Sequence, residues 1–183
     1  MLNKLSKMFK SLSSASLATL LFLGAAACQS EPPAGHKSTD LSALPYPVME
    51  EFADLEPILH YQTDTTYVIN FWATWCKPCV EELPYFEQLH SEIAGKKVKI
   101  ILVSLDFKKD IPTKLLQFVR DNHIQCDVIA LADGRYNDWI EKVDPEWGGA
   151  IPITLVYGPK GRVFQPEQFA SYEELKTMVL GLL

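Results

Sequence analysis

The sequence predicts an α/β fold, with a central mixed, mainly parallel β-sheet flanked by helices. Apolar runs rich in β-branched and aromatic residues alternate along the chain with segments whose apolar residues recur at helical spacing. Such alternation favours parallel strands joined by helical crossovers, with helices on both faces of the sheet. The turn Gly-Pro-Lys-Gly at 158–161 joins the last two apolar runs, and it adds an antiparallel hairpin at one edge.

The expected elements follow in chain order. Strands are expected at 66–72, 97–106, 126–132, 152–158 and 162–165, the second being a nearly continuous run of Val, Ile and Leu that indicates burial on both faces. Helices are expected at 77–94, 112–123, 136–143 and 171–183. In the last helix Ser171 is the expected N-cap, and Glu174 completes a capping box.

The first 27 residues have the composition of an export signal. Three lysines and no acid precede an uncharged apolar run that ends in small residues at Ala27. This run is shorter than the roughly 20 residues of a membrane-spanning helix, so cleavage is favoured over a retained anchor. The segment Leu-Gly-Ala-Ala-Ala-Cys resembles a bacterial lipobox, which implies lipid attachment at Cys28. Ordinary cleavage that leaves a free Cys28 is the alternative.

Composition divides the rest of the chain into a tether and one domain. Residues 28–47 are rich in Pro, Ser and polar side chains, which is typical of a flexible tether. Residues 48–183 have the length of a single domain, and a chain that is 48% hydrophobic can form a substantial core. The net charge of −6 and the absence of a basic run disfavour nucleic-acid binding.

Cys76 and Cys79, two residues apart, lie between an apolar strand and a helix. A structural zinc site needs four ligands, but only Cys126 is left among the cysteines of the domain, and its three histidines show no ligand spacing. We therefore expect no metal site. A structural disulfide would close a very short loop, which removes little entropy from the unfolded chain. Redox chemistry is therefore the interpretation we favour.

The expected position of the two cysteines suits redox chemistry. Cys76 opens a helix, where free backbone N–H groups and the helix dipole favour thiolate over thiol. Pro78 falls in the first helical turn, where its missing N–H costs nothing. Cys79 follows one turn later on the same face and should be more buried. This asymmetry predicts an exposed attacking thiol and a shielded resolving thiol.

The motifs Phe-Trp-Ala-Thr-Trp-Cys-Lys-Pro-Cys at 71–79 and Ala-Ile-Pro-Ile-Thr at 150–154 resemble those of the thioredoxin superfamily over about residues 48–183. The resemblance implies a thioredoxin-like fold and a cis Ile151–Pro152 bond opposite the cysteines. Within this superfamily the chain resembles most the exported, membrane-tethered TlpA/ResA-like proteins. The features that carry this resemblance are the signal, the tether, Asn70 and Glu82. Cytosolic thioredoxins have a titratable aspartate at the position of Asn70.

Glu82 matches the acid that ResA-like proteins have three residues after the second cysteine. Helix geometry places Glu82 within about 60 degrees of Cys79 and Phe86, on the apolar face, and Glu81 on the opposite side. Either Glu82 is a proton acceptor for Cys79, or it is a rim residue whose carboxylate stays in water. Cys126 is expected to be a buried, inert apolar residue.

The resemblance implies thiol–disulfide exchange on the periplasmic side of a bacterial cell envelope, without a cofactor. Cys76 would attack a disulfide of a client protein, Cys79 would release the reduced client, and Glu82 would take the Cys79 proton. Docking of the client is expected at Trp75, Lys77, Pro78, Ile151 and Pro152. Trp147 either lines this groove or packs inside the domain. A membrane electron donor of the DsbD/CcdA type would restore the dithiol, in support of cytochrome c maturation.

Two alternatives remain open at this point. A DsbA-like oxidant would use the same residues, because the Lys77–Pro78 pair sets only part of the redox potential. A copper-handling or client-binding module would use the two thiolates as soft ligands. Exported copper chaperones of this superfamily, however, have a wider cysteine spacing and a partner histidine. A peroxidase is disfavoured because no peroxidatic motif is present.

Overall fold

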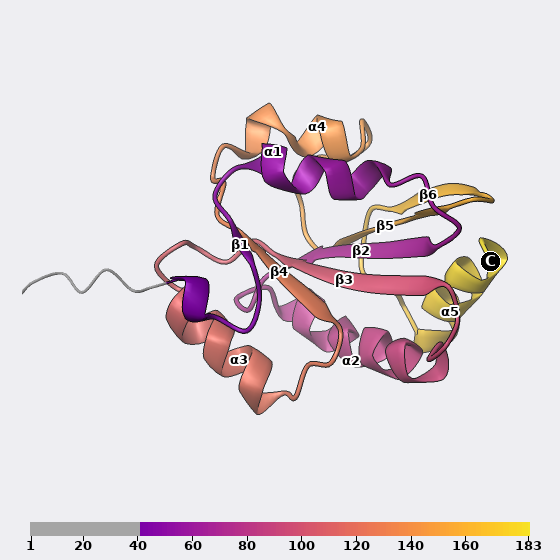
Figure 1. Ribbon diagram of the computed structural model, residues 1–183, viewed down its shortest axis with the longest axis horizontal. Helices are drawn as coiled ribbons and strands as arrows, with labels where there is room; N and C mark the ends of the chain where they lie inside the picture. The colour runs from indigo at the N-terminus through magenta and orange to yellow at the C-terminus, as the bar shows by residue number, and fades with distance from the viewer. Residues whose placement is uncertain (1–40) are drawn as a thin grey trace, which may run out of the picture. The chain divides into compact units, whose positions relative to one another are not determined.

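The computed structural model describes residues 41–183, whose strands form a six-stranded sheet in the order β1-β4-β3-β2-β5-β6 (Figure 1). The expected signal, Cys28 and the tether up to residue 40 lie outside these residues. The strands are β1 Val48–Met49, β2 Thr66–Trp72, β3 Val98–Ser104, β4 Asp127–Leu131, β5 Ile153–Gly158 and β6 Gly161–Gln165.

The pairing of the strands confirms a mixed, mainly parallel sheet. β1, β4, β3 and β2 run parallel to one another, whereas β5 pairs antiparallel with both β2 and β6. Strand β2 therefore lies between a parallel and an antiparallel neighbour, and all seven of its residues are buried. Its register sets Asn70 opposite Leu102 on one side and Thr154 on the other.

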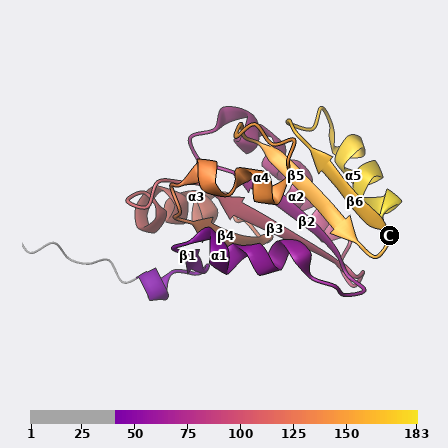
Figure 2. The same ribbon diagram turned by 90° about the horizontal axis from the view of Figure 1, so that it is seen from above.

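Helices cover both faces of the sheet, as the alternating sequence pattern predicts. The helices are α1 Phe52–Leu55, α2 Lys77–Glu92, α3 Leu116–Asp121, α4 Ile140–Val143 and α5 Tyr172–Gly181. Shorter turns extend three of them: the 3-10 turn Glu56–His60 after α1, the π-helical turn Ile111–Leu115 before α3 and the 3-10 turn Tyr136–Asp138 before α4. Helices α1 and α4 lie on one face, and α2, α3 and α5 lie on the other (Figures 1 and 2). Within residues 41–183, no helix is both long and apolar enough to cross a membrane.

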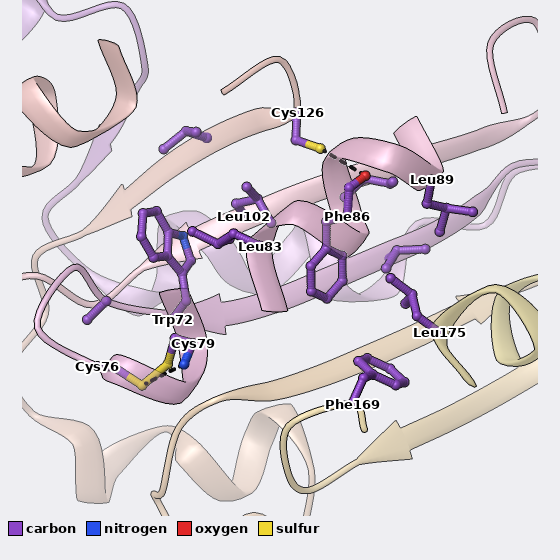
Figure 3. Packing of buried hydrophobic residues seen from close by; sticks show 14 of the residues in the cluster. Trp72, Cys76, Cys79, Leu83, Phe86, Leu89, Leu102, Cys126, Phe169 and Leu175 are labelled. Carbon is purple, nitrogen blue, oxygen red and sulfur yellow. Dashed lines mark hydrogen bonds between the residues drawn. A yellow bond between two sulfur atoms is a disulfide. The ribbon is translucent and has the colours of Figure 1, made fainter. Parts of the chain in front are cut away.

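Two hydrophobic cores result, one on each face. The core under α2 and α5 contains Trp72, Phe86 and Phe169 (Figure 3). The core under α1 and α4 contains Phe71 and Trp139. Because successive strand residues point to opposite faces, the neighbours Phe71 and Trp72 of β2 enter different cores. The end of β2 is thereby held rigidly from both sides just before the cysteine motif.

Residues before Val48, the expected start of the domain, also contribute to the folded part. Residues Leu41–Ala43 form a 3-10 turn, and Tyr46 is 5% exposed. The Tyr46 hydroxyl donates a hydrogen bond of 2.8 Å to the carbonyl of Ile111. Composition missed this contact because one aromatic residue inside a Pro- and Ser-rich stretch does not change the character of the stretch.

Other differences concern the ends of elements. The Ser171 side chain caps α5 by accepting from the N–H of Glu174 at 3.3 Å, as expected. The Glu174 carboxylate accepts from the N–H of Ala170 rather than from Ser171. Cys126 lies directly before β4 and not inside it. The short elements β1 and α1 were not expected, because two to four residues are too few to show a period.

The role of Tyr46 can be tested by stepwise truncation. Tyr46→Phe should lower the free energy of unfolding by about 1 kcal/mol, because only the hydrogen bond to Ile111 is lost. Tyr46→Ala should lower it by about 3 kcal/mol, because the buried ring is lost as well. Urea denaturation measures both values. If Tyr46→Ala changed stability no more than Tyr46→Phe, residues before Val48 would not belong to the core.

Candidate active site

The two cysteines form a disulfide at the N-terminus of α2 (Figure 3), with an S–S distance of 2.00 Å. Cys76 is the N-cap of the helix, in an extended conformation, and its Sγ accepts from the N–H of Cys79 at 3.3 Å. Pro78 lies in the first helical turn. A negative charge on Cys76 Sγ would therefore meet a backbone donor and the positive end of the helix dipole.

The two sulfurs differ in exposure in the expected order, but only slightly. Cys76 is 6% exposed and Cys79 is completely buried. Cys76, the thiol expected to be exposed, is thus nearly covered in the disulfide form. The carbonyl oxygen of Ile151 lies 3.7 Å from Cys76 Sγ.

The expected docking residues surround this disulfide. The Ile151–Pro152 peptide bond is cis, as expected. Pro78, Ile151 and Pro152 line a cleft of about 550 Å³, which we call the proline cleft, together with residues 166–170. Trp75 directly precedes Cys76 in the chain and is 55% exposed. Lys77 is exposed and forms an ion pair with Glu81, 3.6 Å away.

Glu82 is fully buried, so the alternative of a rim residue with a wet carboxylate is wrong. Its Oε1 accepts from Asn70 Nδ2 at 2.8 Å, and its Oε2 accepts from the N–H of Phe169 at 3.0 Å. Burial raises the pKa of Glu82 to about 7, although both hydrogen bonds act in the opposite direction. A carboxyl group with a pKa near neutrality, one helical turn after Cys79, can both take and give a proton.

Asn70 connects Glu82 to the strand that follows Pro152. The same Nδ2 donates to Thr154 Oγ1 at 3.0 Å and lies 3.3 Å from the carbonyl of Ile153. Sequence reasoning used Asn70 only as a residue that cannot titrate. Its structural role follows from the register of β2 with β5, which pairs Asn70 with Thr154.

Asp106 is a site residue that sequence reasoning missed. It is 2% exposed, and it accepts from the Thr74 N–H at 3.1 Å, the Thr74 hydroxyl at 2.5 Å and the Ser104 hydroxyl at 2.7 Å. These bonds tie the loop before Cys76 to the end of β3. The available signal was an aspartate at the end of the expected strand 97–106, a position at which acids have many roles.

Cys126 lies apart from the disulfide, in the core beneath α2 (Figure 3). It is 4% exposed, and its Sγ lies 3.6 Å from the carbonyl oxygen of Phe86. Burial, together with the nearby Glu87 carboxylate, raises the pKa of this thiol far above its usual range. Cys126 is thus the buried apolar residue that was expected. Among residues 41–183, no three His, Cys, Asp or Glu side chains are grouped so that they could hold a metal ion.

Comparison with known proteins relates this arrangement to one family. The family model described as "AhpC/TSA family" matches residues 56–165. The thiol-disulfide oxidoreductase ResA of Oceanobacillus iheyensis is 35% identical over 98 residues, which are 52% of this chain and 45% of that protein. ResA of Bacillus thuringiensis is 33% identical over 98 residues, which are 53% of this chain and 51% of that protein. The chain thus spans about half the length of the curated relatives it matches.

Solved structures agree on the fold. A DsbF homologue from Corynebacterium diphtheriae aligns with a TM-score of 0.53 and 22% identity, over 72% of this chain and 76% of that chain. A secreted thiol-disulfide isomerase from Corynebacterium glutamicum aligns with a TM-score of 0.53 and 20% identity, over 65% and 71% of the two chains. The fold is therefore thioredoxin-like, as expected.

Burial of Glu82 should make the stability of the protein depend on pH. Its pKa is about 7 in the folded protein and about 4.3 in an unfolded chain. Between these values the folded protein binds more protons than the unfolded chain, so the free energy of unfolding falls as pH rises. Between about pH 4.5 and about pH 7.5, wild type should lose about 3 kcal/mol relative to Glu82→Gln.

Urea denaturation at a series of pH values measures this difference. Glu81→Gln is the matched control, because Glu81 is the neighbouring residue on the exposed side of α2. An equal pH trend in both variants would contradict the assignment of the effect to Glu82.

Proposed function

The chain belongs to the AhpC/TSA family, and from this premise we propose that it is a thiol-disulfide oxidoreductase that acts through Cys76 and Cys79. One observation carries the proposal: Cys76 caps α2 and its Sγ accepts the N–H of Cys79, an arrangement that stabilises a thiolate. The names of the ResA relatives give additional support.

The reaction begins with the reduced protein. The Cys76 thiolate attacks one sulfur of a client disulfide, a mixed disulfide forms, and the other client sulfur leaves as a thiolate that takes up a proton. Cys79 loses its proton to Glu82 and attacks Cys76 Sγ. The bond between Cys76 and the client sulfur breaks as the bond between Cys76 and Cys79 forms, and the client sulfur leaves as a thiolate that takes up a proton. The client gains two electrons, and the protein becomes the disulfide form.

Glu82 suits the role of proton acceptor for Cys79. Its carboxylate is buried on the same face of α2 as Cys79. Its pKa of about 7 is closer to the pKa of a thiol than the pKa of an ordinary glutamate is. Client docking would use Trp75, Lys77 and Pro78 together with the backbone at Ile151–Pro152. The proline cleft supports this assignment, because it runs beside Cys76.

We further propose that the protein works outside the cytoplasm, on the periplasmic side of a bacterial envelope, with a lipid at Cys28. The basic and apolar segment before Cys28 supports export, and a relative of the same fold is described as secreted. In an oxidising compartment the dithiol needs an electron donor, for which a membrane protein of the DsbD/CcdA type is the candidate. Clients would be disulfide-containing proteins, including those of cytochrome c maturation.

Trapping of clients tests the roles of the two cysteines. Cys79→Ser removes only the step that releases the client, so mixed disulfides should accumulate on Cys76 and vanish with dithiothreitol. Cys76→Ser should trap far less, because Cys79 is completely buried and does not cap the helix. Non-reducing gels of cell extracts read out both variants. Trapping by Cys76→Ser alone would reverse the assigned roles.

The redox potential decides the direction of exchange. Known oxidoreductases of this kind extend from about −270 mV for thioredoxin to about −120 mV for DsbA. As a reductant, the Cys76–Cys79 couple should lie near the thioredoxin end when equilibrated with dithiothreitol buffers. A potential near that of DsbA would instead establish an oxidant that uses the same residues.

A further inference from the structure

A second cleft adjoins the proline cleft, and Ile151 lines both. It has a volume of about 190 Å³, and aromatic and aliphatic side chains with one glycine line it. We call it the aromatic cleft, after Trp75, Phe107, Tyr136 and Trp147. None of the residues lining it is charged. A cavity for a small-molecule ligand typically has about 300–1,000 Å³, so this one has room for a single large side chain.

The aromatic cleft concentrates the exposed apolar surface of the described part of the protein. Trp75 and Phe107 are each 55% exposed, and their rings stack with centroids 6.0 Å apart. Tyr136, at 36%, is also exposed. Among residues 41–183 six large apolar side chains are exposed, and three of them line this cleft. A contiguous exposed apolar patch of this kind marks an interaction site, whereas single exposed apolar residues are common on any protein surface.

The walls of the cleft are held in place without a ligand. Trp75 directly follows Thr74, and Phe107 directly follows Asp106, so the hydrogen bonds between Thr74 and Asp106 hold together the two segments that carry the exposed rings. Trp147 is 4% exposed, and its Nε1 donates to the carbonyl of Ala150 at 2.7 Å. Trp147 therefore both packs in the core and lines the cleft. The sequence had left these two positions as alternatives.

The location of the cleft relates it to the reactive sulfur. Trp75 precedes Cys76 in the chain, and Ile151 lines both the aromatic cleft and the proline cleft. The carbonyl oxygen of Ile151 lies 3.7 Å from Cys76 Sγ. A client cysteine that reaches Cys76 must therefore bring its neighbouring residues over these two clefts.

We propose that the aromatic cleft is a specificity site for one large uncharged side chain, aromatic or aliphatic, next to the reactive cysteine of a client disulfide. The proposal rests on the proposed exchange function and names the class of client that the site prefers. An apolar side chain gains free energy by leaving water at this site. A charged side chain would lose its hydration without finding a partner there.

Single-turnover reduction of two cyclic disulfide peptides tests the proposal. The peptides differ only in the residues flanking their cysteines, which are Phe in one and Ser in the other. The reduced wild-type protein should react about tenfold faster with the Phe peptide, the range that one apolar group confers on an enzyme. Phe107→Ala should bring the ratio of the two rates close to one, and Phe107→Leu should retain part of the preference.

Tyr61→Ala is the matched control, because Tyr61 is an exposed aromatic residue that lines neither cleft. It should leave the ratio of the rates unchanged. Equal rates of wild type with both peptides, or a preference that survives Phe107→Ala, would overturn the specificity site alone. If neither peptide reacted, the proposed exchange function would be contradicted, and so would the specificity site that rests on it. Sedimentation tests a further outcome. If wild type were a dimer and Phe107→Ala a monomer, the cleft would bind a second copy of the chain, and the proposal would be overturned.

Discussion

The arrangement of the site depends on the burial of one carboxylate inside the core. Glu82 has no access to water, and its two oxygens accept from Asn70 on β2 and from the backbone of Phe169 before α5. A buried carboxylate is costly unless it is hydrogen-bonded, so these donors constrain where the three elements can lie. Through Asn70 the constraint reaches Thr154, two residues after Pro152. The helix that carries the cysteines and the strand that carries the cis bond are thus tied to the same group.

A second constraint acts on the other side of the cysteines. Asp106 binds the loop before Cys76 through Thr74, and this loop leads directly into the cap of α2. The disulfide consequently lies between two buried acids, one that orders the chain before it and one that follows it on the helix. These surroundings hold Cys76 Sγ 3.7 Å from the carbonyl oxygen of Ile151, the residue that lines both the proline cleft and the aromatic cleft.

Features that depend on neighbouring residues were predictable from the sequence. The position of Cys76 at the start of a helix follows from a preceding strand and from Pro78 in the first turn. The position of Glu82 on the apolar face of α2 follows from its angle to Cys79 and Phe86 around the helix axis, since helix geometry is regular. Contacts over long sequence separations were not predictable in this way. Tyr46 packs against a turn 65 residues later, and no local pattern records that partner.

The sequence by itself determined the mixed parallel sheet and the cysteine pair at a helix N-terminus, because periodicity and helix capping act over a few residues. Only the tertiary structure decided which polar groups meet inside the core. The pairing of Asn70 with both Glu82 and Thr154 requires a particular register of β5 against β2. The aromatic cleft likewise needs four separate chain segments to converge, around residues 75, 105–107, 136–140 and 147–151. Side chains from separate segments become neighbours only when the whole chain has folded, so their contacts cannot be predicted from residue type alone.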